Sequence, residues 1–570
     1  MFFIIILYYF VFLIIHNQCK IIISPPKHWV KHAHIPHESR YENFYFYLKQ
    51  KNNEILNKHL HLISNPRHNL YHNTSWLTLD QITRIVKPDS ISIKRLYYYL
   101  WSNGINLKEC RHSRDGGILV CPILLTKANK ILSANYTDFR HRIKNINITR
   151  TLSFILPNYL SNHIVTISPT TIFPDLSLFH NSITSNKSKL IRQKRQDDLC
   201  SCQSYIKPCY LRNHYDIHQY RAHSSTNITL SIIGLANQYI NDNDTNLFLK
   251  FIDNNNDNIK PKINILGYNN QSIPGREASL DIQYALAIAR GVQVTFWSIT
   301  NLNDPFSDFL FQLANMKHPP DIISISYGFS ETRNDYTLFQ KAIDQELQKA
   351  AARGITIVAA TGDNGVGADS VDDCQSYHIN FPASSPWVTA VGGTMNCLER
   401  GAFFSSGGFS TYEVQPIYQQ NVVLHYLHQY NLTLPHANLF NSMGRAVPDV
   451  SLYATRYLNI VNGLIKSTSG TSAAAPIFAA IIALLNDYQV RHGRKRLGFL
   501  NPLLYQYASD IFHDITTGYN VGCNTTGFHA GIGWDPVTGL GRPSFIRFQK
   551  VLDAINLKQH QFKSLRINKN

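Results

Sequence analysis

Ser472 is the first residue whose type and surroundings could do chemistry. Small and hydroxylated residues, Ser467 to Ala475, lead directly into an apolar run, Pro476 to Leu485, which predicts a tight turn followed by a buried helix. We expect Pro476 in the first helical turn, where the N–H that it lacks would be unbonded anyway. A hydroxyl at a helix start lies near free backbone N–H groups, which suit an oxyanion forming beside it. Ser472 is therefore a candidate nucleophile, although this stretch alone fits a simple helix cap better.

A nucleophilic serine also needs a base, and the chain offers a pair of acids in place of the usual histidine. Glu277 and Asp281 are four residues apart in a helix-like segment, so they stack on one helical face. The same stripe continues to Tyr284, whereas polar residues such as Ser279 and Gln283 fall well round the helix from it. Two like charges at this spacing repel unless a shared proton or a partner relieves them. We therefore interpret the pair as functional rather than as two solvated surface acids.

Asp363 is a third candidate because of its place after a buried run. Residues Ile355 to Ala360 read as a strand, and a glycine-rich turn from Gly362 to Gly367 follows it. In folds with a parallel sheet, functional groups gather outside the carboxyl ends of the strands. Asp-Asn-Gly is also an ordinary turn sequence, so Asp363 needs support from other segments.

The elements that must position these residues alternate along the chain. Short apolar runs read as buried strands, and helix-like segments, notably Glu277 to Arg290 and Tyr336 to Ala352, lie between them. This alternation predicts an α/β fold with a parallel sheet covered by helices on both faces. The expected strands are Ile228 to Leu235, Ile263 to Gly267, Val292 to Trp297, Asp321 to Ser326, Ile355 to Ala360 and Trp387 to Val391.

Length and charge limit the class of protein. A chain of 570 residues exceeds what one hydrophobic core usually serves, so we expect two or more folded units. A hydrophobic content of 44% and a charged content of 16% indicate a globular protein. The net charge of +17 could suit nucleic acid or a membrane surface. Lys and Arg are scattered, however, without a dense stripe, so we expect no nucleic-acid partner.

The N-terminus indicates entry into the secretory pathway. Residues 2–15 form an unbroken apolar run that fits the core of a signal peptide, which we place at residues 1–19. The run is shorter than a membrane span of about 20 residues, although an uncleaved anchor stays open. Nine Asn-x-Ser/Thr sequons and nine cysteines agree with this route. Cys110 and Cys121 have a hairpin-like separation that favours a disulfide, and the other cysteines offer no convincing zinc set.

Residues 20–195 precede the alternating pattern, and we interpret them as a propeptide domain of α+β type. Trp76 to Val86 reads as a capped amphipathic helix, and Gly117 to Leu125 reads as a strand. The basic tetrad Arg192 to Arg195 is a candidate cleavage site for proprotein convertases, although an ordinary solvated charge run stays open. Residues 196–570 then form the second domain.

Three segments, Gly275 to Tyr284, Gly362-Asp363 and Ser469 to Pro476, together resemble the sedolisin family of serine-carboxyl peptidases. The resemblance covers most of the chain after residue 200 and reaches the leader at Trp76 to Asp80. It implies a subtilisin-like fold for residues 196–570, with a propeptide domain before it. Further matching segments are Ser324 to Gly328, Ser406 to Ser410 and Gly444 to Asp449.

By this resemblance, Ser472 is the nucleophile and Glu277 the general base and acid. Asp281 orients Glu277, and Asp363 supplies the oxyanion hole. A carboxyl base, with an ordinary pKa of about 4.3, suits catalysis in acid. Asp363 must be protonated to donate to an oxyanion, and a neutral carboxylic acid in that role has precedent. The resemblance thus implies an acid-acting peptidase, made as a zymogen, that releases tripeptides from free N-termini through a serine ester.

The resemblance also implies a calcium site in the C-terminal loop. Calcium takes roughly six to eight oxygens, which carboxylates and backbone carbonyls supply. Without the resemblance, the segment reads as a glycine-rich turn. The expected ligands, three of them through main-chain oxygens, are Asp514, Ile515, Gly531, Gly533 and Asp535.

The chain departs from the family pattern around Asp363. Asn364 stands where serine is expected, and the cysteine that usually follows is displaced, with Cys374 as its expected counterpart. A bridge from Cys374 to Cys523 is then plausible, whereas a second bridge in the C-terminal loop is not expected. These changes bear on the geometry of the loop rather than on the catalytic residues.

Three alternatives stay open. One is an endopeptidase of the same family. Another is a subtilisin-like enzyme with a histidine base, against which stands the lack of a His-Gly or Asp-Ser/Thr-Gly segment before Ser472. The third is a non-catalytic secreted binding protein on this fold. Expected partners are polypeptide substrates and the propeptide as inhibitor, with no stable membrane span, and the expected destination is a lysosome, an acidic vacuole or the exterior.

Overall fold

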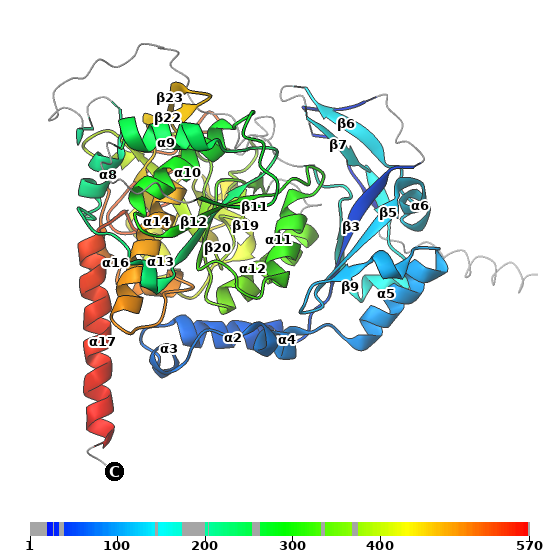
Figure 1. The fold of residues 1–570 in the computed structure, drawn as a ribbon, viewed down its shortest axis with the longest axis horizontal. Coiled ribbons are helices and arrows are strands. Elements are labelled where there is room, and N and C mark those ends of the chain that lie inside the picture. The colour runs from blue at the N-terminus through cyan, green and yellow to red at the C-terminus, as the bar shows by residue number, and fades with distance from the viewer. Residues whose placement is uncertain are drawn as a thin grey trace, which may run out of the picture.

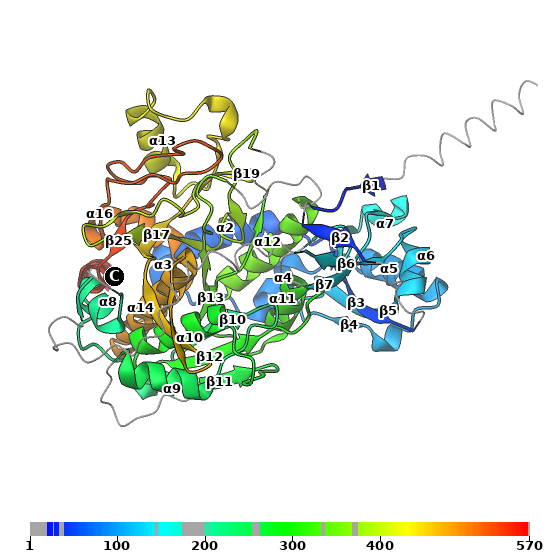
Figure 2. The same ribbon diagram turned by 90° about the horizontal axis from the view of Figure 1, so that it is seen from above.

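The computed structural model describes residues 20–26, 28–32, 39–142, 146–173, 200–202, 205–253, 263–331, 337–367 and 374–567. An N-terminal domain, up to residue 173, lies beside a larger domain that begins at residue 200 (Figure 1, Figure 2). The expected signal peptide at residues 1–19 and the basic tetrad at 192–195 lie outside the described residues.

A mainly parallel sheet forms the centre of the larger domain. Its strand order is β11, β12, β10, β13, β15 and β17, and β17 also pairs with β21 in parallel and with β18 antiparallel. All the predicted strands are present, and β17 extends beyond its predicted end because Val391 to Thr394 pair with β21. The bounds are β10 Thr229–Gly234, β11 Ile263–Leu266, β12 Gln293–Ser298, β13 Ile322–Ile325, β15 Thr356–Ala360, β17 Thr389–Met395, β18 Arg400–Gly401 and β21 Val450–Tyr453.

Helices cover both faces of this sheet, as the alternating pattern predicted. Helices α10 (Arg276–Ile288) and α14 (Thr471–Arg491) pack on one face, and α11 (Pro305–Asn315) and α12 (Thr337–Ala352) lie on the other (Figure 1). Successive side chains of a strand point to opposite faces. In β13, for example, Ile322 joins the core under α10 and α14, and Ile323 joins the core under α11 and α12.

Smaller elements complete the larger domain and lie mostly around the edges of the sheet. The helices are α8 Pro208–His214, α9 Asp242–Phe251, α13 Gln420–Gln429, α15 Asn501–Gln506, α16 Ala508–Ile511 and α17 Phe545–Ile567. The short strands are β14 Phe329–Ser330, β16 Asn380–Phe381, β19 Gly408–Val414, β20 Gly444–Val447, β22 Tyr457–Val461, β23 Leu464–Thr468, β24 Phe512–His513 and β25 Arg542–Pro543.

The N-terminal domain is an α+β unit, in agreement with the prediction. Its main sheet has the antiparallel order β4, β5, β3, β9, and its predicted helix is present with Thr78 in a capping box. The strands are β1 Lys20–Ile22, β2 Trp29–Lys31, β3 Tyr41–Leu48, β4 Arg111–His112, β5 Ile118–Leu124, β6 Thr137–His141, β7 Asn147–Arg150, β8 Ser153–Ile155 and β9 Ile164–Ser168. The helices are α2 Asn53–Ser64, α3 Asn69–Asn73, α4 Leu79–Val86, α5 Ser90–Ser102, α6 Leu125–Ile131 and α7 Asn158–Ser161.

The N-terminal domain packs on the α11 and α12 face of the larger domain. Apolar side chains from β3, α2 and α4, among them Tyr47, Leu60 and Ile82, belong to the same buried cluster as the side chains of α11 and α12. Full burial of one such side chain is worth about 1.5–3 kcal/mol relative to exposure. The two domains therefore share one hydrophobic core in the full-length chain.

Two helices differ from the sequence prediction. Helix α14 begins at Thr471, so Pro476 is its sixth residue and lies inside the helix rather than in its first turn. The small residues before Pro476 extend the helix because alanine is a strong helix former. In α10, Ser279 and Gln283 are buried although they were expected away from the buried face. Gln283 is satisfied there by hydrogen bonds with the backbone of Ile460, at 2.7 and 2.9 Å.

Four disulfides are present among the described residues. The predicted bridge between Cys110 and Cys121 is confirmed, and so is the one between Cys374 and Cys523. Two bridges were not predicted, Cys200–Cys209 and Cys202–Cys397. Helix α14 is apolar and long enough to cross a membrane, but 89% of its most apolar window is buried inside the fold. It is a core helix of this domain.

Candidate active site

Ser472 lies in the first turn of α14, one residue after the helix begins at Thr471. It is buried, with 6% of its surface exposed, because this end of the helix enters the centre of the domain. The first N–H groups of a helix have no partner within the helix. The hydroxyl is therefore held beside backbone donors and the positive end of the helix dipole.

Pro476 changes the surroundings of this serine. It lies four residues after Ser472, and its missing N–H would otherwise have bonded the Ser472 carbonyl. The hydroxyl of Ser326, just beyond β13, donates to that carbonyl instead, at 3.4 Å. The internal proline thus frees the carbonyl of the candidate nucleophile for a contact with another segment.

A carboxyl group, and not an imidazole, lies beside the Ser472 hydroxyl, close enough for that hydroxyl to lower its pKa. That carboxyl belongs to Glu277, the second residue of α10, which packs against α14. Asp281 follows one turn later, next to Glu277, and is 1% exposed. Among the residues that the structure describes, no basic side chain pairs with Asp281. The two acids therefore lie on one face of α10, as their spacing predicted, and the packing of α10 against α14 brings them to Ser472.

Burial is the main cause of the shifted pKa values of Glu277 and Asp281. It raises the pKa of Asp281 well above its usual range, and the neighbouring charge of Glu277 raises it further. Burial also raises the pKa of Glu277, although the hydrogen bond from Ser472 opposes that shift. Two buried carboxyl groups in contact do not both ionise readily, so they share one proton. Asp281 is the more deeply buried of the two and holds its proton more tightly, so Glu277 is the acid that ionises first beside Ser472.

Asp363 lies beside the same helix start, in the turn that follows β15. Its Oδ1 accepts hydrogen bonds from the backbone N–H and the hydroxyl of Thr471, at 2.7 and 3.0 Å. Burial raises the pKa of Asp363 to about 6, against the effect of these two bonds. Its Oδ2 faces Gly470, where an added Cβ would lie only 2.6 Å away. Asp363 is thus a neutral acid below pH 6 and lies next to the nucleophile candidate.

The fold brings all four predicted catalytic residues to one place. Sequence reasoning missed two side chains that hold them there. Ser326 bonds the carbonyl of Ser472 and also faces Asp281. Thr471 donates to Asp363 through its backbone N–H, and its hydroxyl accepts a hydrogen bond from the N–H of Gly362 at 3.0 Å. The one available signal was the proline four residues after Ser472, which implies a carbonyl that needs a donor from elsewhere.

The predicted calcium ligands form a separate cluster near the C-terminus. Asp514 Oδ2 accepts a hydrogen bond from the N–H of Gly533 at 2.8 Å, and Asp535 Oδ2 accepts one from the N–H of Gly531 at 3.2 Å. Both carboxylates therefore hold the same turn. The carbonyl of Ile515 lies beside them, because one hydroxyl bonds both this carbonyl and Asp535.

The surroundings of Asp535 indicate whether these residues suit a cation. Its side chain is fully buried, and burial raises its pKa to about 7. Its partners in the described part of the chain are N–H groups and the hydroxyl of Thr538, without a basic side chain. A buried carboxylate needs a compensating positive charge when it ionises. The donor set consists of oxygen atoms only, which fits calcium.

Comparison with known proteins agrees with this geometry. Residues 27–173 match the activation domain of pro-kumamolisin, and residues 259–493 match the subtilase family of peptidases. Tripeptidyl-peptidase 1 of Homo sapiens is 30% identical over 89% of this chain and 91% of its own length. The chimpanzee enzyme, Pan troglodytes, gives the same values, and the enzyme of Mus musculus is 29% identical over 92% of this chain and 94% of its own.

A solved structure shows the same fold. Pseudomonas sedolisin, a serine-carboxyl proteinase complexed with pseudo-iodotyrostatin, has a TM-score of 0.51 and 23% identity. The match covers 62% of this chain and 99% of the sedolisin chain. The protein is a serine-type peptidase, and it belongs to the tripeptidyl-peptidase 1 family of sedolisin-type serine-carboxyl peptidases.

Proposed function

We propose that this peptidase acts in acid and releases tripeptides from the free N-termini of polypeptides. The observation that carries the proposal is the position of the Ser472 hydroxyl beside the Glu277 carboxyl, with Asp281 next to Glu277 on the same helix. The similar proteins are named tripeptidyl-peptidase 1, which supports the length of the product.

In the first half-reaction, Ser472 is the nucleophile and Glu277 is the base. The serine oxygen attacks the carbonyl carbon of the scissile peptide bond, and its proton moves to Glu277. Glu277 then gives this proton to the leaving amine, and the C–N bond breaks. The N-terminal fragment remains as an ester on Ser472. Asp281 keeps its own proton and favours the ionised form of Glu277 before attack.

Asp363 stabilises the negative oxygen that forms in each half-reaction. As a neutral acid it donates a hydrogen bond to the oxyanion, together with backbone N–H groups at the start of α14. In the second half-reaction, Glu277 takes a proton from water, the water oxygen adds to the ester carbon, and the ester C–O bond breaks. The proton returns to Ser472, and the peptide acid leaves.

These roles require acidic surroundings. Asp363 must carry its proton, so the oxyanion hole works below its pKa of about 6 and fails above it. One of the two acids on α10 also keeps a proton, because burial raises both pKa values. Catalysis should therefore decline as the pH rises through about 6.

The full-length chain is a zymogen, and we propose that its propeptide inhibits the peptidase domain. Support comes from the match of residues 27–173 to an activation domain and from the core that the two domains share. The four disulfides fit an oxidising compartment. We propose passage through the secretory pathway to a lysosome or an acidic vacuole, or secretion, since the catalytic acids require low pH.

We also propose that calcium binds the C-terminal loop. Asp514 and Asp535 would hold it through carboxylates, and Ile515, Gly531 and Gly533 through backbone carbonyls. Bound calcium supplies the positive charge that the buried Asp535 lacks among the described residues, and it takes no part in bond cleavage. The fully buried Asp535 supports this proposal.

Product analysis tests the function. The acid-processed protein is incubated with a 20-residue peptide carrying a free or an acetylated N-terminus, and products are identified by mass spectrometry over time. We expect successive tripeptides from the free peptide, no cleavage of the acetylated one, and no products from Ser472→Ala. Internal fragments of many sizes would instead identify an endopeptidase.

A further inference from the structure

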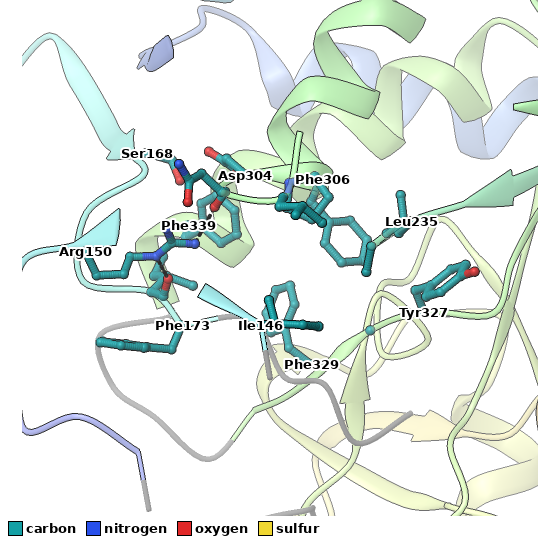
Figure 3. A pocket seen from close by; sticks show the side chains of 16 residues that line it. Ile146, Arg150, Ser168, Phe173, Leu235, Asp304, Phe306, Tyr327, Phe329 and Phe339 are labelled. Atoms are coloured by element: carbon teal, nitrogen blue, oxygen red, sulfur yellow. Dashed lines mark hydrogen bonds between the residues drawn. The ribbon is translucent and has the colours of Figure 1, made fainter. Parts of the chain in front are cut away.

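A pocket between the two domains holds one carboxyl group in largely apolar surroundings (Figure 3). On the peptidase side its lining includes Leu235, Phe306 and Phe329, together with Asp304. Asp304 is 4% exposed, and its Oδ2 has no hydrogen-bond donor within reach among the described residues. A buried carboxylate needs a donor or a positive charge. This oxygen is therefore left for a group that the described part of the peptidase domain does not supply.

The propeptide partly compensates Asp304 in the full-length chain. Among the described residues that line the pocket, the only basic one is Arg150 of the propeptide. Burial raises the pKa of Asp304, whereas the nearby hydroxyl of Ser168, also in the propeptide, and the charge of Arg150 act in the opposite direction. Both groups leave with the propeptide. The processed enzyme then keeps a carboxyl in an apolar pocket whose described lining offers it no cation.

The other oxygen of Asp304 fixes the position of this carboxyl. Asp304 is the N-cap residue of α11, and its Oδ1 accepts a hydrogen bond from the N–H of Ser307 at 3.2 Å. The side chain is thus held at the helix start with Oδ2 to spare. A ligand that bonds Oδ2 meets a group that is already ordered, which favours binding because little side-chain entropy is lost.

The pocket also reaches the catalytic centre. Ser326 bonds the carbonyl of Ser472. The next two residues, Tyr327 and Gly328, line the pocket. Figure 3 shows Tyr327 toward one end of the lining and Asp304 toward the propeptide side of it. A peptide that extends from Ser472 into this pocket therefore leads toward Asp304.

We propose that Asp304 binds the α-ammonium group of the substrate in the processed enzyme. The proposal rests on the proposed function and deepens it, because three extended residues between the anchored amine and the scissile bond span about 10 Å. An α-amino group, with an ordinary pKa of about 7.7–8.0, is fully charged in acid. It brings N–H donors and a positive charge to a carboxylate that has lost both, and such charge-assisted hydrogen bonds are strong.

Peptides with altered N-termini test the proposal in the acid-processed enzyme. One hexapeptide has a free α-amino group, a second has hydrogen in its place, and a third is this des-amino peptide with lysine as its first residue. No other basic residue is present. The variant is Asp304→Asn, which keeps an N-cap acceptor and removes the charge. We expect it to lower kcat/KM for the free-amine peptide about 30-fold, mostly through KM, and for the des-amino peptide less than twofold.

Asp308→Asn is the matched control. Asp308 lies one turn later on α11 and also faces a propeptide side chain, Tyr45, but it is outside the pocket lining. This variant should stay within twofold of wild type on all three peptides. Asp304→Ser keeps an N-cap hydroxyl without a charge, and it replaces Asp304→Asn if the amide variant does not fold.

The results distinguish failure of the anchor from failure of the proposed function. Equal losses on the free-amine and des-amino peptides would overturn the anchor by showing a structural role for Asp304, and an unaltered preference for the free amine would overturn it too. A lysine side chain that restores full turnover would assign Asp304 to a side-chain cation instead. Wild-type enzyme that cleaves the free-amine and des-amino peptides equally, or neither, would overturn the proposed function, and the anchor with it.

Discussion

Two groups of buried acids in this protein differ in whether a positive charge accompanies them. Glu277 and Asp281 lie in the catalytic centre without a basic partner for Asp281 among the described residues. Asp115 of the propeptide and Glu346 of α12 both form ion pairs with Lys349, the second at 2.7 Å. All three members of this second group, the Lys349 cluster, are almost fully buried where the two domains meet.

The two groups differ in the direction in which the pKa of an acid is shifted. Burial acts to raise the pKa of Asp115, but the charge and hydrogen bond of Lys349 outweigh it and hold that pKa below its usual range. Nothing comparable opposes burial at Asp281, whose pKa rises. Lys349 thus keeps Asp115 ionised, whereas burial still raises the pKa of Glu346, the second acid of the cluster, to about 7. The clearest contrast is therefore between Asp115, which a cation holds ionised where the domains join, and Asp281, which has no such cation among the described residues and keeps its proton.

The largest expected effect follows from removing the base. Glu277→Gln should lower kcat/KM in acid by at least about 10³-fold, because an amide cannot take the proton of Ser472. The fold should persist, since a neutral amide costs less to bury than a carboxylate. Tripeptide release from the 20-residue peptide with a free N-terminus measures the first effect, and thermal unfolding measures the second. Peptidase turnover equal to wild type would refute the carboxyl mechanism.

Removing the positive charge of Lys349 should leave Asp115 and Glu346 buried without a cation, as Asp281 is in the catalytic centre. Lys349→Met, in a Ser472→Ala background that prevents self-processing, should destabilise the full-length chain by about 3–5 kcal/mol, because two acids remain buried and unpaired. Denaturant unfolding measures this loss. Combining Lys349→Met with Asp115→Asn and Glu346→Gln should restore most of it. An unaltered midpoint of denaturant unfolding in Lys349→Met would show that the ion pairs contribute nothing to the free energy of unfolding.

Calcium should act on Asp535 as Lys349 acts on Asp115. A chelator should lower the melting temperature of the Ser472→Ala protein, and calcium at about 100 times its dissociation constant should restore about 2.7 kcal/mol. Asp535→Asn should abolish both the response and the binding heat in calorimetry. Equal melting temperatures with and without chelator would refute the proposal that calcium binds this loop and stabilises it.

The smallest expected effect concerns the pH above which activity declines. The folded-state pKa of Asp363 is raised to about 6, so its contribution to stability and to the oxyanion hole is present in acid and is lost as the pH rises through 6. Asp363→Asn donates a hydrogen bond at every pH, so it should keep reduced activity and lose the decline near pH 6. A pH–rate profile checks this, with Asp363→Ala as a control that lacks the donor. The account fails if Asp363→Asn keeps the wild-type limit.

Local pattern predicted much of this molecule. Alternating apolar runs predicted the strands of the parallel sheet, because a strand buried on both faces needs an uninterrupted apolar sequence. The four-residue spacing of Glu277 and Asp281 placed both on one helical face, because a helix turns every 3.6 residues. Motif order then linked these acids to Ser472 and Asp363. Each of these inferences depends on residues close together in the sequence.

Only the tertiary structure decided which distant groups meet. The packing of α14 against β13 brings Ser326 to the carbonyl of Ser472, which Pro476 leaves without a helical partner. The bridge between Cys202 and Cys397 and the Lys349 cluster each join parts of the chain that are about 200 residues apart. Such contacts depend on how whole elements pack. Sequence therefore determined the candidate chemistry, and folding determined which acids lack a cation and can carry a proton.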